Sequence, residues 1–173
     1  AFGVQDVSLA PQGAHTGEVT AALARASGAT YALVGHAERR AMGESNAVVA
    51  ADARAALEAG LVPIVCIGES ERDREGKFFS AIESMLGASL ARVLPTEIAK
   101  IVIAYEPVWA IGAAEAPGAR TVAEAILYIR KTLVQLYGRE VGLKTKILYG
   151  GAVDEGNAQG LLMSGQANGF LIG

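Results

Sequence analysis

One histidine, several glutamates and several glycines directly follow the apolar segments of this chain. They stand in the runs Gly35-His36-Ala37-Glu38-Arg39-Arg40, Gly68-Glu69, Glu106-Pro107, Gly150-Gly151-Ala152 and the final Gly173. A carboxylate and an imidazole that face one cavity suit proton transfer beside a carbonyl group. Small residues with free backbone N–H groups suit the binding of a phosphate dianion. These two chemistries are the ones that the residue types favour.

Each of these residues also has a purely structural interpretation. A histidine at a strand end, such as His36, can simply bond to neighbouring backbone, and Glu106 can be an ion-pair partner in a loop. Gly150-Gly151 can be a plain turn. Cys66 lies in an apolar segment and is expected to pack in the core, whereas His15, in a polar loop, is expected at the surface or an interface. With two histidines and one cysteine, a metal site would need carboxylates at a spacing that the sequence does not show, so none is expected.

The elements that must position these residues alternate along the chain. Short apolar runs predict strands, and stretches with helical spacing of apolar residues predict the helices between them. The strands are expected at 1–7 (an extended start), 31–34, 62–67, 101–105, 146–149 and 170–172. The helices are expected at 17–26, from Ser45 or Asn46 to Glu58, around Phe78 to Leu90, from the capping box Thr121–Glu124 onward, and between Asp154 and Met163. Thr16 is expected to cap the first of them, and a further helix is expected to start at 37–40.

This alternation predicts an α/β fold. About six strands joined by five helices are typical of a parallel sheet built by right-handed crossovers. Either an open doubly wound sheet or part of an eight-stranded barrel fits, and both place ligands at the carboxyl ends of the strands. No Gly-x-Gly-x-x-Gly follows a strand, which disfavours a dinucleotide-binding fold. We expect a single domain over residues 1–173.

Composition narrows the possible partners. Fifteen lysines and arginines against 18 aspartates and glutamates give a net charge of −3, without a basic block, which argues against a nucleic-acid surface. No apolar run approaches the length of a membrane span. A single cysteine excludes a disulfide framework, and no basic-then-apolar leader is present, so a reducing, cytoplasmic setting is expected.

Five motifs in register resemble the triosephosphate isomerase family. They are Gly13-Ala14-His15-Thr16-Gly17-Glu18-Val19, Val34 to Arg40, Ala104 to Gly112 (Ala-Tyr-Glu-Pro-Val-Trp-Ala-Ile-Gly), Tyr149 to Val153, and Asn168 to Gly173. The resemblance covers the whole chain in the family's order. It implies an incomplete (β/α)8 barrel that begins at the third strand, so that two strands and the last helix are absent from the sequence. A complete barrel takes about 250 residues.

The resemblance also implies roles for individual residues. Glu106 is similar to the family's base and His36 to its neutral electrophile, the pairing for which this family is the standard example. Glu38 resembles a second active-site carboxylate, although a structural ion pair is an alternative. Backbone N–H groups of Gly112, Ala152 and Gly173 are expected to bind phosphate, and Pro107 to Ala119 resembles a mobile lid. The loop 13–18 resembles the one that enters a partner subunit, which implies a homodimer with Thr16 at the loop tip and Glu18 with Arg39 as a cross-subunit ion pair.

The chain departs from the family's pattern in several places. Ala113-Ala114-Glu115 stands where the family has Thr-Gly-Lys, the lid is longer, Ala37 and Ala152 replace serines, and Asn168 replaces an aspartate. The family's Asn and Lys at the end of its first strand have no counterpart in the sequence. We therefore expect the 173-residue chain alone to show little or no activity.

The expected function is cofactor-free interconversion of glyceraldehyde 3-phosphate and dihydroxyacetone phosphate through an enediolate, in glycolysis and gluconeogenesis. An isomerase of four-carbon ketose phosphates is the first alternative. A barrel remnant that binds phosphate or a partner without catalysis is the second, and a doubly wound phosphate-binding regulator is the third. An upstream apolar strand that ends in Asn-x-Lys would separate the enzyme from the remnant.

Overall fold

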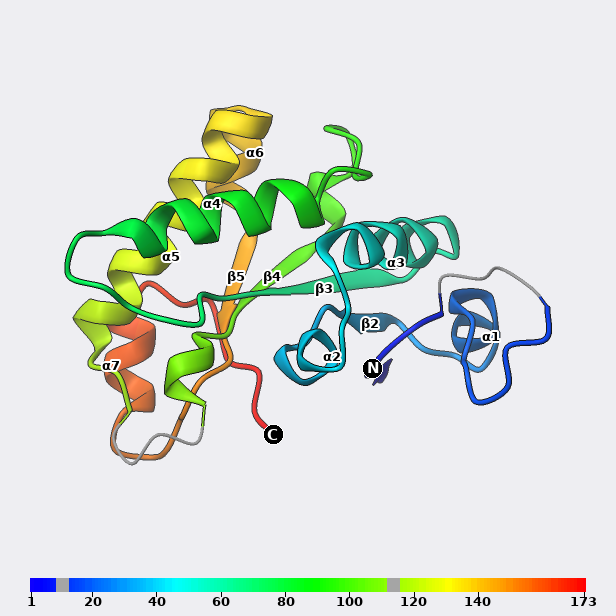
Figure 1. Cartoon of the computed structure of the whole chain (residues 1–173), viewed down its shortest axis with the longest axis horizontal. Coiled ribbons are helices and arrows are strands. Elements are labelled where there is room, and N and C mark those ends of the chain that lie inside the picture. The colour runs from blue at the N-terminus through cyan, green and yellow to red at the C-terminus, as the bar shows by residue number, and fades with distance from the viewer. Residues whose placement is uncertain (9–12, 112–115) are drawn as a thin grey trace. The chain divides into compact units, whose positions relative to one another are not determined.

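The computed structural model describes residues 1–8, 13–111 and 116–173, and its strands and helices alternate along the chain (Figure 1). The strands are β1 (Gly3–Val4), β2 (Tyr31–Val34), β3 (Val62–Ile67), β4 (Val102–Tyr105) and β5 (Lys146–Tyr149). The helices are α1 (Ala21–Ala26), α2 (Ala37–Ala41), α3 (Asn46–Glu58), α4 (Lys77–Ser89), α5 (Ala119–Tyr137), α6 (Arg139–Lys144) and α7 (Ala158–Met163), with short 3-10 turns at Ile98–Lys100 and Val108–Ala110. The predicted α/β fold is confirmed.

Hydrogen bonding orders the strands β1-β2-β3-β4-β5 in one sheet. The β1–β2 and β2–β3 pairs are parallel, with Gly3 opposite Tyr31 and Tyr31 opposite Val62. Parallel neighbours point the same way, so the residues that follow β2 and β3 leave the sheet at the same edge. The residues that the sequence predicts to be functional follow the ends of the strands.

The chain falls into two compact units. The first comprises Ala1–Cys66 and Gly87–Val102, and the second comprises Ile67–Leu86 and Ile103–Gly173. In the first, α3 packs against β2 and α1, and Val49, Ala53 and Val65 are fully buried. In the second, α5 packs against α6 and α7 over a core that includes Ile126 and Ile147. Each unit therefore has its own apolar core.

Two predicted helix starts are wrong. The first helix begins at Ala21, with Thr20 rather than Thr16 as the N-cap, whose hydroxyl accepts the N–H of Leu23 at 3.1 Å. Gly17, at φ +91°, cannot continue a right-handed helix, so the helix starts after it.

The capping box predicted at Thr121–Glu124 is also absent. The helix α5 begins earlier, at Ala119, with Gly118 at its N-cap and no side-chain cap. The Glu124 carboxylate accepts instead from the Arg72 guanidinium, a tertiary contact that sequence spacing does not reveal.

The last predicted strand is reduced to one bridge. Residues 170–172 form no strand, and Phe170 pairs with Tyr149 in a single parallel bridge. The Leu171 N–H donates to the Tyr149 carbonyl at 3.0 Å, but Ile172 is 71% exposed. One bridge is too short to count as a strand, so the structure has five strands in the described residues rather than six.

Candidate functional site

His36 lies at the turn from β2 into α2, where backbone geometry orients its ring. Gly35 precedes it at φ +69°, and a Cβ there would lie 2.7 Å from a Val49 methyl, so only glycine fits. His36 is the N-cap of α2, and its Nδ1 accepts the Glu38 N–H at 3.3 Å. A ring nitrogen that accepts a hydrogen bond carries no proton, which leaves Nε2–H as the donor of the neutral imidazole.

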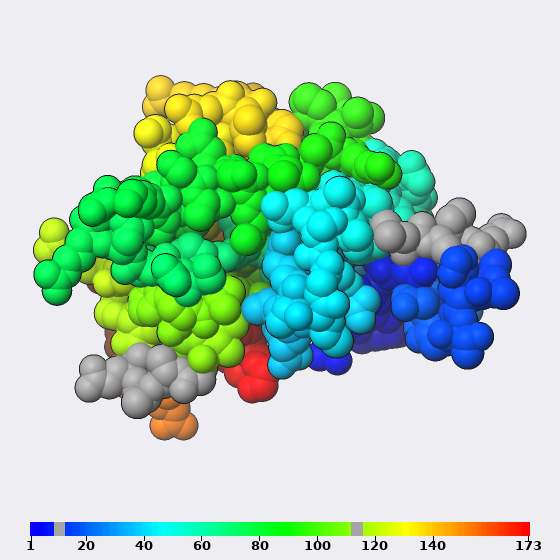
Figure 2. Space-filling model, viewed as in Figure 1, coloured from blue at the N-terminus to red at the C-terminus, as the bar shows by residue number. Residues whose placement is uncertain are grey.

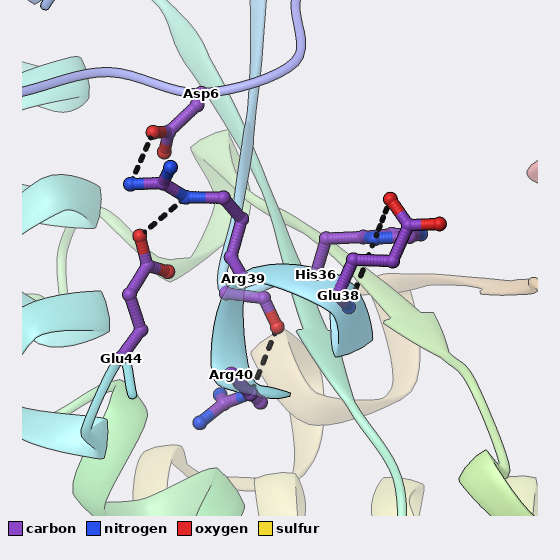
Figure 3. A network of polar contacts seen from close by, with 7 residues as sticks. Asp6, His36, Glu38, Arg39, Arg40 and Glu44 are labelled. Carbon is purple, nitrogen blue, oxygen red and sulfur yellow. Dashed lines mark hydrogen bonds and ion pairs between the residues drawn. The ribbon is translucent and has the colours of Figure 1, made fainter. Parts of the chain in front are cut away.

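Glu38 lies beside this ring but points into solvent. Its side chain is 86% exposed, and its Oε2 is 3.9 Å from His36 Nδ1, beyond hydrogen-bond distance. Figure 3 shows both side chains at the same end of α2. The role of Glu38 as an active-site carboxylate stays a prediction.

Arg40 holds the His36 turn in place, a role that sequence reasoning missed. Its guanidinium donates to the carbonyl of Gly35 at 2.8 Å and to Asn46 Oδ1 at 2.7 Å. It also donates to the carbonyl of Cys66 and to Ser89 Oγ, both at 3.1 Å. These bonds tie the end of β2 to the start of α3, the end of β3 and the end of α4. Cys66 itself is buried in β3, as predicted.

Glu106 follows β4 in the second unit and is 2% exposed. Its backbone N–H donates to the Ile67 carbonyl at 2.8 Å. Two glycines make room for it: a Cβ on Gly68 would lie 1.8 Å from the Glu106 carbonyl oxygen, and one on Gly150 would lie 2.8 Å from Glu106 Cγ. Gly150 is therefore more than a turn residue, because its missing side chain admits the Glu106 carboxylate.

A second buried carboxylate, Glu69, lies under the start of the candidate lid. Its Oε1 accepts from the Tyr105 hydroxyl at 2.9 Å and from Trp109 Nε1 at 2.8 Å. Arg72 adds an ion pair at 3.5 Å. Burial, together with the Glu69 charge, raises the pKa of Tyr105 far above its ordinary value, so the phenol stays a neutral donor. The position of Glu69, two residues after the end of β3, was the available sequence signal for it.

Of the three candidate phosphate-binding residues, the structure describes Ala152 and Gly173, both in the second unit. Gly112, with lid residues 113–115, lies outside the described residues. Ala152 is half-buried and its carbonyl accepts from Asn157 Nδ2 at 3.2 Å. Gly173 is exposed. Their backbone N–H groups as phosphate ligands remain a prediction.

The candidate dimer residues all lie in the first unit. Thr16 and Glu18 are exposed. Arg39 is engaged within its own chain, with Nη2 2.8 Å from Asp6 Oδ2 and Nε 2.6 Å from Glu44 Oε1 (Figure 3). A cross-subunit pair between Arg39 and Glu18 would thus add to existing ion pairs.

In the described residues, no helix is long and apolar enough to cross a membrane.

The family model for triosephosphate isomerase matches residues 1–173. Three similar curated relatives all bear that name. The relative from Hyphomonas neptunium (strain ATCC 15444) is 46% identical over 94% of this chain and 65% of its own length. Those from Roseiflexus sp. (strain RS-1) and Mycobacteroides abscessus are 41% and 42% identical, over 100% and 99% of this chain and 69% and 67% of their lengths. The chain thus spans about two thirds of these relatives, and it belongs to the triosephosphate isomerase family.

Proposed function

We propose that this chain carries the base and the electrophile of an enzyme that interconverts glyceraldehyde 3-phosphate and dihydroxyacetone phosphate. The observation that supports this most is Glu106, a buried carboxylate whose side chain is accommodated by the absence of a side chain at Gly150. A carboxylate removed from water is a stronger base toward a weakly acidic C–H group.

The proposed reaction conserves atoms and electrons without a cofactor. The Glu106 carboxylate takes the proton from the carbon beside the carbonyl, and the C–H electron pair forms the C=C bond of an enediolate. The carbonyl electron pair moves onto oxygen, and His36 Nε2–H donates a hydrogen bond to that oxygen. The hydroxyl proton on the neighbouring oxygen then moves to the new oxyanion, which leaves the negative charge on that neighbouring oxygen. This oxygen forms the new carbonyl as the C=C electron pair takes the proton back from Glu106 at the former carbonyl carbon, which completes the exchange of aldose and ketose.

His36 is suited to this part because its Nδ1 already accepts the Glu38 N–H. This bond selects the tautomer with the proton on Nε2, and a neutral donor can stabilise an oxyanion without giving up its proton. The Arg40 bond to the Gly35 carbonyl fixes the backbone from which the ring projects.

The remaining assignments complete the proposal. Gly112, Ala152 and Gly173 bind the phosphate through backbone N–H groups, and Glu38 serves as a further carboxylate near His36. A second copy of the chain receives the loop 13–18, with Thr16 at its tip and Glu18 directed to Arg39. The cytoplasmic setting stays a prediction from the single cysteine.

The test is Glu106→Gln in a completed chain, in which residues 1–173 are joined to the segments of the Hyphomonas neptunium relative that lie outside the match. The amide has nearly the size of the carboxylate but cannot accept the proton, so kcat should fall by about 10²–10⁴ while binding of a phosphate analogue is retained. Glu140→Gln, on an exposed pair with Lys144, is the matched control and should leave kcat unchanged. If Glu106→Gln turns over at the control rate, the proposal is wrong; if the unmutated completed chain binds phosphate without turnover, the non-catalytic alternative is right.

A further inference from the structure

Three carboxylates from separate segments meet in the first unit, away from His36. Asp6 follows β1, Glu44 lies in the turn between α2 and α3, and Asp52 is on α3. One carboxylate oxygen from each lies within 4.8 Å of the others. Two oxygens on opposite sides of a calcium ion are about 4.6–5.2 Å apart, twice a Ca–O bond, so the spacing suits one shared cation.

Arg39 satisfies only part of this cluster. It binds Oδ2 of Asp6 and Oε1 of Glu44. The atoms that remain, Asp6 Oδ1, Glu44 Oε2 and Asp52 Oδ1, are each buried without a hydrogen-bond partner. Asp52 as a residue is only 1% exposed. A buried carboxylate oxygen without a partner is costly, so three such oxygens on the three residues of one cluster indicate a missing ligand.

The charges around the cluster point to the kind of ligand. One guanidinium faces three carboxylates, which leaves two negative charges unbalanced, and a divalent cation would close this deficit. Glu18 lines a cavity that Glu44 and Asp52 also line, and it adds further negative charge.

The cavity borders two of the three carboxylates, Glu44 and Asp52, and has room for an ion with its water. Its volume is about 310 Å³, and Ser8, His15, Glu18, Arg39, Glu44 and Asp52 supply its polar lining. Mg²⁺, Ca²⁺ and Mn²⁺ take oxygen ligands and keep several water molecules, so three carboxylates suffice as the protein's share. The surface over α2 and the start of α3 is drawn in cyan in Figure 2.

We propose that Asp6, Glu44 and Asp52 bind one divalent cation of the oxygen-ligated kind. The cation joins the segment after β1 to the α2–α3 turn and to α3, and Arg39 links two of these carboxylates, Asp6 and Glu44, to the helix that His36 caps. It holds this part of the first unit together and takes no part in the proposed isomerisation.

The test uses the 173-residue chain, stripped with a chelator and titrated calorimetrically with MgCl₂, CaCl₂ and MnCl₂. We expect one saturable site for at least one of these ions and a rise in the thermal midpoint on its addition. Asp52→Asn should weaken binding at least about tenfold, because loss of even an outer-shell partner costs that much. The same variant should raise the midpoint of the metal-free chain, since it removes a buried like charge.

Weaker cation binding together with a higher thermal midpoint of the metal-free chain identifies Asp52 as a ligand, because the loss of a merely structural residue would lower the midpoint. Glu44→Gln provides a second, independent loss of a ligand, and Glu140→Gln, on the exposed pair in α6, should bind as the parent chain does. No saturable binding up to about 1 mM, the weak end of protein calcium sites, would overturn the proposal. Cation binding that Asp52→Asn and Glu44→Gln leave unchanged would also overturn the proposal. The negative charge of the cluster would then be neutralised by bound protons alone.

Discussion

Gly150→Ala should slow catalysis about ten- to a hundredfold without disturbing the fold. Gly150 donates its N–H to the Tyr105 carbonyl at 2.9 Å and has an ordinary backbone conformation, outside the left-handed region, so alanine meets no backbone strain there. The added methyl would lie 2.8 Å from Glu106 Cγ and 3.2 Å from Glu106 Oε1. The substitution therefore acts on the Glu106 side chain.

The size of the effect follows from this contact. To restore an ordinary carbon–carbon contact of 3.4 Å from 2.8 Å, Glu106 must retreat by at least 0.6 Å. A misplacement of about 1 Å at a reacting group costs roughly a hundredfold in rate. We therefore expect kcat to fall about ten- to a hundredfold, which corresponds to about 1.4–2.7 kcal/mol of barrier.

The assay measures kcat and KM of the completed chain with glyceraldehyde 3-phosphate. KM should change little, because the methyl displaces the base and leaves the proposed phosphate ligands in place. Gly160→Ala in α7 is the matched control, since its methyl would be 3.9 Å from the nearest side chain and should leave kcat unchanged. An unchanged kcat in Gly150→Ala, with the variant folded, would refute the argument that this glycine accommodates the base.

Three further predictions concern stability and specificity. Burial raises the pKa of Tyr149 from 10.0 to about 12, so the folded state favours the neutral phenol. The neutral phenol therefore contributes to the free energy of unfolding in full below about pH 10. This contribution, at most about 2.7 kcal/mol, is lost as the pH rises through about 12. Tyr149→Phe should lose less stability than the parent between about pH 9 and pH 11 in urea titrations, and an equal loss would contradict this assignment. Arg40→Met should lower the free energy of unfolding by about 3–5 kcal/mol, because it leaves buried acceptors unpaired. Urea unfolding measures this change, and a loss below about 1 kcal/mol would show that Arg40 does not hold the His36 turn. The Ala113-Ala114-Glu115 lid should let the completed chain accept a four-carbon ketose phosphate better than the Hyphomonas neptunium relative does, as a side-by-side kcat/KM comparison shows; complete rejection of that substrate would mean that these lid residues do not affect specificity.

Strand positions could be predicted from the sequence because apolar runs bounded by turn residues carry strong local signals. The predicted bounds of β2, β3 and β5 match the structure. Helix starts were less predictable, since Thr16 and Thr20 are both good caps and the choice rests on the backbone at Gly17. The helix α6 was not predicted at all, because its six residues carry little periodicity.

The site shows the same division between local and tertiary signals. Strand ends identified His36 and Glu106 as candidates. Arg40, in contrast, matters through bonds to residues up to 49 positions away. The carboxylates of Asp6, Glu44 and Asp52 come together only in the folded chain, so no spacing along the sequence could indicate a cation site there.

The most direct test of the central claim is isomerisation in D₂O. If Glu106 carries the proton between neighbouring carbons, it exchanges that proton with solvent, and product formed by the completed chain should carry deuterium on the carbon that receives it, as NMR detects. Glu106→Gln should abolish this incorporation together with turnover. Turnover or deuterium incorporation that Glu106→Gln leaves unchanged would contradict Glu106 as the base.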